Sequence, residues 1–249
     1  MTEQDRQRAI RLRLARMGEP RAASVIATGF AALDAALGTG GFPRGRVVEL
    51  FGASSTGKTT LALQVIAHAQ RGGLTAVWID AEHAFDAAYA AMLGVAIDRL
   101  PVAKPESAEQ ALEIVRQLAA SQAVDLLVVD SAAALIPRLE LETGLGESGQ
   151  GLQSRVLVSG LRRLAGIVAR AGTVVVFLNQ LRSRPQASRG ESETAAGGPA
   201  LKLYAAVRIS LDEPAAGRVR FRVLKNKAAA AFGEGDLHYQ SGLGFVKSP

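Results

Sequence analysis

Residues 52–60 carry the strongest chemical signal in the sequence. They read Gly-Ala-Ser-Ser-Thr-Gly-Lys-Thr-Thr and satisfy the phosphate-binding pattern G-x-x-x-x-G-K-[ST]. Glycines at both ends let backbone N–H groups approach phosphate oxygens where a side chain would collide. We therefore predict a nucleotide site, with contacts from Gly52, Ala53, Ser54, Ser55, Thr56, Gly57, Lys58, Thr59 and Thr60.

Three side chains have the chemistry that a bound triphosphate needs. The Lys58 ammonium can reach the β- and γ-phosphates, and the Thr59 hydroxyl can ligate the Mg²⁺ ion that bridges them. Asp130 ends an apolar run, the position from which such folds hold Mg²⁺. The expected cofactors are ATP and Mg²⁺.

The flanking elements place these residues together. An apolar strand pattern over 47–51 runs into the loop, and a helical pattern with Leu61, Leu63 and Val65 runs out of it. A glycine-rich turn with an incidental lysine is the alternative, and this flanking pattern argues against it.

Further strands are expected over 75–79, 126–129 and 173–178. They deliver Glu82, Asp130 and Gln180 to one crevice of an open α/β sheet. Glu82 is a candidate for activating the attacking water, although a carboxylate at a strand end is also a common capping residue. His83 is interpreted as a packing residue.

Composition limits the class of protein. The 249 residues are 48% apolar, which is enough for one α/β domain over 25–249 with a short arm over 1–24. No apolar run is long enough for a membrane span, no secretory signal is recognisable, and cysteine is absent. We expect a cytoplasmic protein without membrane contact. The net charge of +6 favours polyanionic partners.

Arginines cluster in segments that we expect to be irregular. Glycine-rich stretches over 139–151 and 181–199 are interpreted as two mobile loops, joined by a helix over about 152–170. The basic arm over 1–24 fits a solvated terminus or a docking arm equally well. Strict alternation over 218–223 predicts a strand with one cationic face, either a solvated edge strand or a binding surface. The arginines expected to contact a phosphate backbone are Arg155, Arg162, Arg182, Arg184 and Arg189.

With these motifs in order, the chain resembles the bacterial RecA recombinases, from about residue 25 to about residue 245. The resemblance is carried by the phosphate loop, Asp-Ala-Glu-His at 80–83, Val-Val-Asp-Ser at 128–131, Asn-Gln-Leu-Arg at 179–182, Glu-Thr-Ala-Ala-Gly-Gly at 193–198 and Lys-Asn-Lys at 225–227. It implies a RecA-like P-loop NTPase core, with a mostly parallel central sheet flanked by helices and antiparallel strands near the C-terminus.

The resemblance also implies residue roles. Glu82 matches the glutamate that activates water, and Gln180 matches the residue that senses the γ-phosphate and relays it to a DNA loop. Asp86 and Tyr89 match residues that hold and stack on adenine, and Tyr239 is expected at a neighbour's nucleotide. Lys225 and Lys227 match lysines that reach the ATP of the next subunit, so hydrolysis would require self-association. The two loops match the DNA-binding loops, with Arg155, Arg162, Gly197 and Gly198 at backbone-contact positions.

Four departures from the family pattern leave the function open. The second loop lacks the family's large apolar wedges and reads Ser-Arg-Pro-Gln-Ala-Ser-Arg over 183–189. In the first loop, Gln150 stands where the family usually has methionine. The N-terminal arm is shorter than the family's. The family's C-terminal regulatory domain is also expected to be absent. The first hypothesis is a DNA-dependent ATPase that assembles on single-stranded DNA in repair, recombination or the SOS response. The second is an accessory protein of translesion mutagenesis that modulates RecA or a polymerase, and a small-molecule P-loop kinase fits poorly.

Overall fold

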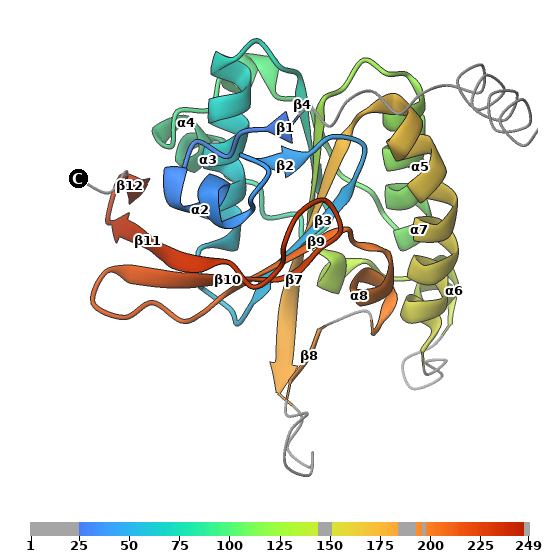
Figure 1. The fold of residues 1–249 in the computed structure, drawn as a ribbon. Coiled ribbons are helices and arrows are strands. Elements are labelled where there is room, and N and C mark those ends of the chain that lie inside the picture. The colour runs from blue at the N-terminus through green and yellow to red at the C-terminus, as the bar shows by residue number, and fades with distance from the viewer. Residues whose placement is uncertain (1–24, 144–150, 184–192, 196–197, 247–249) are drawn as a thin grey trace, which may run out of the picture.

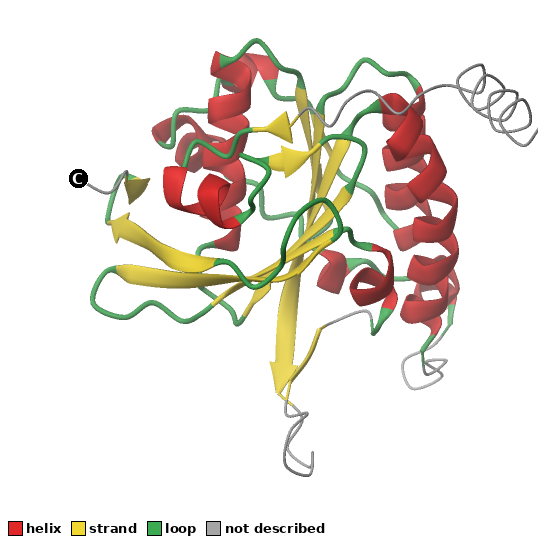
Figure 2. Ribbon diagram, viewed as in Figure 1, coloured by secondary structure: helices red, strands yellow, loops and turns green. Residues whose placement is uncertain are grey.

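The computed structural model describes residues 25–143, 151–183, 193–195 and 198–246. A large sheet forms the centre of the molecule, and helices cover both of its faces (Figures 1 and 2). The strands are β1 (Val25–Ile26), β2 (Phe42–Pro43), β3 (Val47–Gly52), β4 (Ala76–Asp80), β5 (Val102–Ala103), β6 (Leu126–Asp130), β7 (Val174–Ser183), β8 (Glu193–Ala195), β9 (Val207–Leu211), β10 (Arg218–Asn226), β11 (Glu234–Gln240) and β12 (Gly244–Val246). The helices are α2 (Ala31–Ala36), α3 (Lys58–Arg71), α4 (Ala87–Met92), α5 (Ala108–Ala120), α6 (Arg138–Glu142), α7 (Leu152–Ala171) and α8 (Ala200–Tyr204), with short 3-10 helices at Ile97–Arg99 and Ala132–Ala134.

The main sheet has the strand order β12-β11-β10-β9-β3-β7-β6-β4-β5, and β8 pairs with β7 outside this path. Neighbours from β5 to β9 are parallel, while β9, β10, β11 and β12 pair antiparallel. The predicted fold, a parallel α/β centre with antiparallel strands near the C-terminus, is confirmed. Because the central strands are parallel, the carboxyl ends of β3, β4, β6 and β7 meet at one edge of the sheet.

Two apolar cores lie on opposite faces of this sheet. Along β7, Val176 and Leu178 belong to the core under α2 and α3, whereas Val175 and Phe177 belong to the core under α5 and α7. This alternation follows from the two-residue period of a strand, and it explains why both faces must be apolar. The sheet is therefore held from both sides, and its polar strand ends are fixed in position.

The two expected irregular segments are wrong at their first residues, while 144–150, 184–192 and 196–197 lie outside the described residues, and of the two alternatives for 218–223 the edge strand is wrong. Residues 138–142 form α6, and 181–183 extend β7, where they pair with β8. Strand β10 is also no edge strand, because β11 pairs along it. The sequence of β11, Glu-Gly-Asp-Leu-His-Tyr-Gln, carries little strand propensity, so the strand that covers β10 is hard to foresee.

The cationic face of β10 is paired with acidic side chains of its neighbours. Arg220 contacts Glu234 of β11 at 2.6 Å, and Arg222 contacts Asp212 beyond β9 at 2.7 Å. Much of the charge on this face is therefore balanced locally. None of the helices in the described residues is long and apolar enough to cross a membrane.

Candidate nucleotide site

The glycine-rich loop connects β3 to α3 and leaves no room for side chains at its ends. A Cβ atom added to Gly52 would lie 2.3 Å from the Leu211 carbonyl oxygen, and one added to Gly57 would lie 2.6 Å from the Phe245 ring. Gly57 also has a φ of 84°, which favours glycine, and it precedes the first turn of α3. Backbone N–H groups at the start of this 14-residue helix can thus face an anion.

Lys58 lies over the loop that precedes it. Its Nζ donates to the carbonyl oxygens of Ala53 and Gly52, at 2.5 and 3.2 Å, and to the Thr56 hydroxyl at 3.3 Å. Burial lowers the pKa of Lys58, and the nearby carboxylates of Asp130 and Glu82 act in the opposite direction. A phosphate group could replace the neutral carbonyl acceptors with charged ones, which form stronger hydrogen bonds with an ammonium group.

Thr59 and Asp130 lie together beside the loop. The Thr59 hydroxyl donates to Asp130 Oδ2 at 3.0 Å. Burial, with a further contribution from the Glu82 charge, raises the pKa of Asp130 to about 6. A hydroxyl and a partly buried carboxylate are oxygen donors that suit Mg²⁺ together with phosphate oxygens. The donor set therefore fits the ion expected from the sequence.

Glu82 and Gln180 meet at the same edge. Strands β4 and β6 are paired, and the Asp130 carbonyl accepts from the N–H of Glu82 at 3.2 Å. Gln180 Nε2 donates to Glu82 Oε1 at 3.3 Å, and the Ser131 hydroxyl donates to the same oxygen at 2.5 Å. Ser131 was missed as a site residue, although its position directly after Asp130 at a strand end is a usable signal. The Glu82 side chain is exposed and could contact water.

These groups share one cavity of about 530 Å³, within the usual size range of ligand pockets. Its lining includes Lys58, Thr59, Glu82, Asp130, Ser131, Gln180, Pro214, Val219, Tyr239 and Phe245. Tyr239 and Phe245 add an aromatic corner, with ring centroids 5.8 Å apart. Tyr239 borders the cavity of its own subunit, and sequence reasoning did not include Phe245, which lies about 190 positions from the loop.

The expected adenine residues lie beside this cavity rather than in its lining. Asp86 caps α4 and accepts from the N–H groups of Ala88 and Tyr89, at 2.9 and 3.0 Å. Tyr89 shares a 2.7 Å hydrogen bond with Thr60 in the first turn of α3. His83 is exposed, with a φ of 54°, so its interpretation as a packing residue is wrong.

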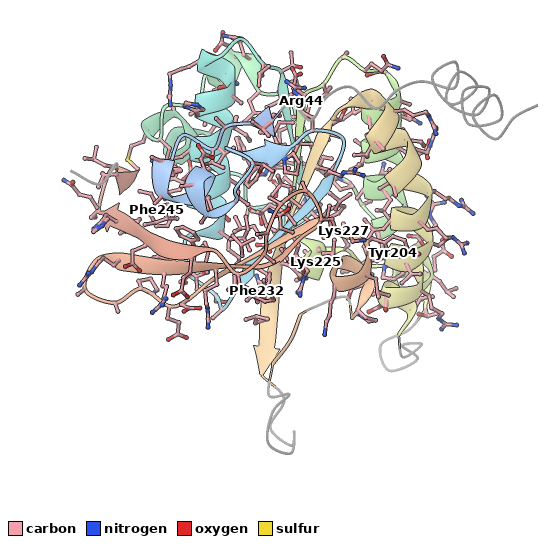
Figure 3. The ribbon with its side chains drawn as sticks, in the orientation of Figure 1. Arg44, Tyr204, Lys225, Lys227, Phe232 and Phe245 are labelled. Atoms are coloured by element: carbon pink, nitrogen blue, oxygen red, sulfur yellow. The ribbon has the colours of Figure 1, made fainter. Side chains whose placement is uncertain are left out.

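The two lysines near the C-terminus lie away from the cavity. Lys225 Nζ donates to the Lys202 and Leu203 carbonyls at the end of α8, at 2.7 and 3.1 Å. Lys227 N–H donates to the Ala206 carbonyl just after α8 at 2.9 Å, and Phe232 N–H donates to the Val223 carbonyl of β10 at 2.7 Å; Figure 3 labels these two residues with Lys225 and Tyr204. Burial lowers the pKa of Lys225, and the charges of Lys227 and Arg208 lower it further. This group of residues, Lys225, Lys227 and the 79% exposed Phe232, is called the lysine edge below.

The residues expected to bind DNA are only partly described. Arg155 and Arg162 are exposed on α7, and Arg182 lies in β7. Gly198 packs against the first turn of α7, because a Cβ atom there would lie 2.7 Å from Ser154 Oγ. The end of the segment over 181–199 thus contacts the start of α7, the helix that follows the segment over 139–151. Arg184, Arg189 and Gly197 lie outside the described residues.

Comparison with known proteins gives a consistent result. Residues 9–245 match a family model described as the RecA N-terminal domain. The chain is 49% identical over 243 residues to Protein RecA of Chlorobium chlorochromatii, covering 92% of this chain and 69% of that protein. It is 46% identical over 231 residues to Protein RecA of Leptospira meyeri (88% and 60%) and 49% identical over 230 residues to Protein RecA of Bifidobacterium breve (88% and 59%). The matched part spans between 59% and 69% of the lengths of these three relatives.

Proposed function

The chain belongs to the RecA family, and from this premise we propose that it is an ATPase that binds single-stranded DNA and acts in DNA repair, recombination or the SOS response. The observation that carries the proposal is one cavity that joins a glycine-lysine loop to three polar strand ends, those bearing Glu82, Asp130 and Gln180. Residues 25–249 would form the ATPase core, and the basic segment 1–24 a short arm.

The principal polar groups in and beside the cavity have proposed tasks. Lys58 and the N–H groups of residues 52–60 would hold the phosphates, and Thr59 with Asp130 would hold Mg²⁺, which would supply positive charge to the bound triphosphate. Glu82 accepts a hydrogen bond from water and orients it toward the γ-phosphorus. Gln180 contacts the γ-phosphate. Asp86 and Tyr89, which lie beside the cavity, are assigned to the adenine base, and Tyr239 is assigned to the nucleotide of a neighbouring subunit, although it borders the cavity of its own subunit.

We assign Lys225 and Lys227 to the nucleotide of a neighbouring subunit. Within one subunit Lys225 donates hydrogen bonds to backbone carbonyls of α8, and neither lysine lines the cavity. In an assembly they would add positive charge where negative charge develops during phosphoryl transfer. Hydrolysis would then require self-association into an oligomer or filament.

DNA binding is assigned to the two loop regions and their flanks, including Arg155, Arg162, Arg182, Arg184, Arg189, Gly197 and Gly198. The exposed arginines of α7 and the contact between Gly198 and that helix support a shared surface. Arginine binds the phosphates of a nucleic acid strongly and without sequence preference. The choice of single-stranded DNA as the ligand follows from the resemblance to the RecA recombinases.

A second candidate function rests on the composition of residues 183–189. This stretch has no bulky apolar side chain that could separate stretched bases. An accessory protein of translesion mutagenesis, which modulates RecA or a polymerase without exchanging strands, would not need such wedges.

Steady-state turnover of Mg-ATP with and without single-stranded DNA tests the proposal. We expect turnover to rise with DNA, Lys58→Ala to abolish it, and DNA affinity to fall steeply with salt because phosphate contacts dominate. The Arg116→Ala variant, on the exposed face of α5, is a matched control and should keep wild-type turnover. Turnover that ignores DNA, in a protein that still binds RecA, would favour the accessory function. An absence of ATP binding would contradict the proposed ATPase function.

A further inference from the structure

A buried charged cluster lies beneath the nucleotide cavity, in the middle of the sheet. Glu49 of β3 has no exposed surface, and its carboxylate accepts from Asn179 Nδ2 of β7 at 2.8 Å. On the other side, Arg208 of β9 donates from Nε to Glu49 Oε2. Strands β7, β3 and β9 are consecutive in the sheet, and Glu49 lies directly opposite Arg208. The cluster therefore joins three strands through side chains as well as through backbone hydrogen bonds.

One end of the cluster leads to the residue assigned to the γ-phosphate. Asn179 Oδ1 accepts from the backbone N–H of Gln180 at 2.9 Å. Gln180 in turn donates to Glu82 at 3.3 Å, in the cavity. Because Glu49 holds the Asn179 amide, it also fixes the orientation of the oxygen that binds the Gln180 N–H. A change at Glu49 should therefore reach Gln180 through a single intervening side chain.

The other end leads to the phosphate loop and to the lysine edge. The guanidinium carbon of Arg208 lies 4.5 Å from the ring centroid of Phe51, which directly precedes Gly52. Arg208 also lies opposite Lys225 in the pairing of β9 with β10. The same ion pair thus supports the start of the loop and adjoins the strand that carries Lys225.

Stability is not a sufficient reason for this arrangement. Placing a carboxylate in a site without solvent is costly, and a buried ion pair is often no more stable than an apolar pair of similar volume. A buried ion pair does, however, fix the register and orientation of the groups around it when all of its hydrogen bonds are made. The observed geometry suits positioning better than it suits net stabilisation.

We propose that Glu49 is a positioning residue that, held by Arg208, orients Asn179 and thereby sets Gln180 for recognition of the γ-phosphate. This inference rests on the proposed function, in which Gln180 contacts that phosphate. Glu49 does not itself touch the nucleotide. Its effect should therefore appear in the preference for a nucleoside triphosphate over a diphosphate and leave binding of the diphosphate unchanged.

The test is titration calorimetry of Mg-ATPγS and Mg-ADP against the wild-type protein and the isosteric variant Glu49→Gln. We expect the affinity for ADP to change less than twofold and the preference for ATPγS to fall roughly tenfold, the effect of losing one well-placed charged hydrogen bond. Gln180→Ala should lose the preference to a similar degree. Thr173→Val is the matched control: Thr173 is buried just before β7, at the other end of the strand from Gln180, and donates to the Val124 carbonyl at 2.8 Å.

A second variant covers the case in which Glu49→Gln does not fold. In Glu49→Met/Arg208→Met both buried charges are removed together with the acceptor for Asn179 Nδ2, and removing both charges is far better tolerated than removing one. It should unfold close to the wild-type temperature and show the same loss of preference. A circular-dichroism melt of each variant checks this.

The outcomes separate this inference from the proposed function. If Gln180→Ala loses the preference while both Glu49 variants keep it, the positioning role is wrong and the proposed function stands. If the Glu49 variants weaken ADP and ATPγS equally, the residue is merely structural. If the wild-type protein has no preference, or Gln180→Ala retains it, the assignment of Gln180 fails and the inference fails with it.

Discussion

The nucleotide cavity and the lysine edge are built on the same sheet but differ in how complete they are. In the cavity, Lys58, Asp130 and Glu82 come from separate elements and already lie within one space of about 530 Å³. At the lysine edge, Lys225 is bonded to the carbonyls of α8, and the Phe232 side chain is 79% exposed. A single subunit therefore brings the cavity groups together, whereas the lysines of the lysine edge do not line that cavity.

The difference follows from how each region is held. The cavity groups sit at the ends of parallel strands that are packed on both faces, so their positions cost little further ordering when a ligand binds. Lys225 would have to exchange two carbonyl acceptors for a phosphate of another subunit. Binding of nucleotide should consequently be a property of one subunit, and fast hydrolysis a property of two.

Among the changes that compare the cavity with the lysine edge, the largest effect is expected from Glu82→Gln. Loss of the carboxylate should lower kcat by about 10²- to 10⁴-fold, the usual contribution of a general base, while ATP affinity stays within a few fold. Single-turnover hydrolysis and nucleotide titration measure the two quantities. An unchanged kcat would mean that the cavity is not the hydrolytic site, and the comparison between the two regions would lose its basis.

A smaller effect is expected from Lys225→Ala, and it sharpens the comparison. The variant should bind ATP normally and lose about 10²-fold in kcat, as when one charge-stabilising donor is removed. Mixing it with Glu82→Gln should restore part of the activity, because one subunit then supplies an intact cavity and the other an intact lysine. Lys202→Ala, an exposed lysine of α8, is the control and should need no complementation. Mixtures no more active than the separate variants would contradict a shared site.

The smallest effect is expected from Asp130→Asn, which should change how the free energy of unfolding depends on pH. Its pKa is raised to about 6 in the folded protein, so the folded state binds this proton more tightly than the unfolded chain does. By linkage, the group lowers the free energy of unfolding above pH 6, and this penalty is relieved as the pH falls toward 4. Asp130→Asn should therefore be more stable than wild type at pH 8, by on the order of 2 kcal/mol, and show no such gain at pH 4. Urea unfolding at both pH values measures this, and an equal stability difference at both would contradict it.

The Glu49 cluster connects the two regions physically. It holds Asn179 beside the cavity on one side and Arg208, opposite Lys225, on the other. The cluster built on the Glu49–Arg208 ion pair, which spans strands β7, β3 and β9, thus links the nucleotide cavity to the lysine edge. Measurements on Glu49→Gln in mixtures with Lys225→Ala would show whether the cluster also affects the lysine edge.

The sequence was most informative where neighbouring residues form the site. The phosphate loop was predictable because Gly52, Gly57 and Lys58 act within one turn between a strand and a helix. Convergence of Glu82, Asp130 and Gln180 was also predictable, since parallel strands place their carboxyl ends at a common edge. The boundaries of the irregular segments were not predictable, because α6 and the pairing of β7 with β8 depend on contacts beyond the local pattern.

By itself, then, the sequence determined the family, the layered α/β fold and the residue types of the phosphate site, all of which depend on local pattern and strand order. Only the tertiary structure decided which side chains meet across the sheet. Phe245 against Gly57, Ser131 on Glu82 and the pairing of Glu49 with Arg208, 159 positions away, depend on strand register and on the path of β9 to β12. Register between distant strands is set by packing of the whole core, and no local pattern of residues encodes it.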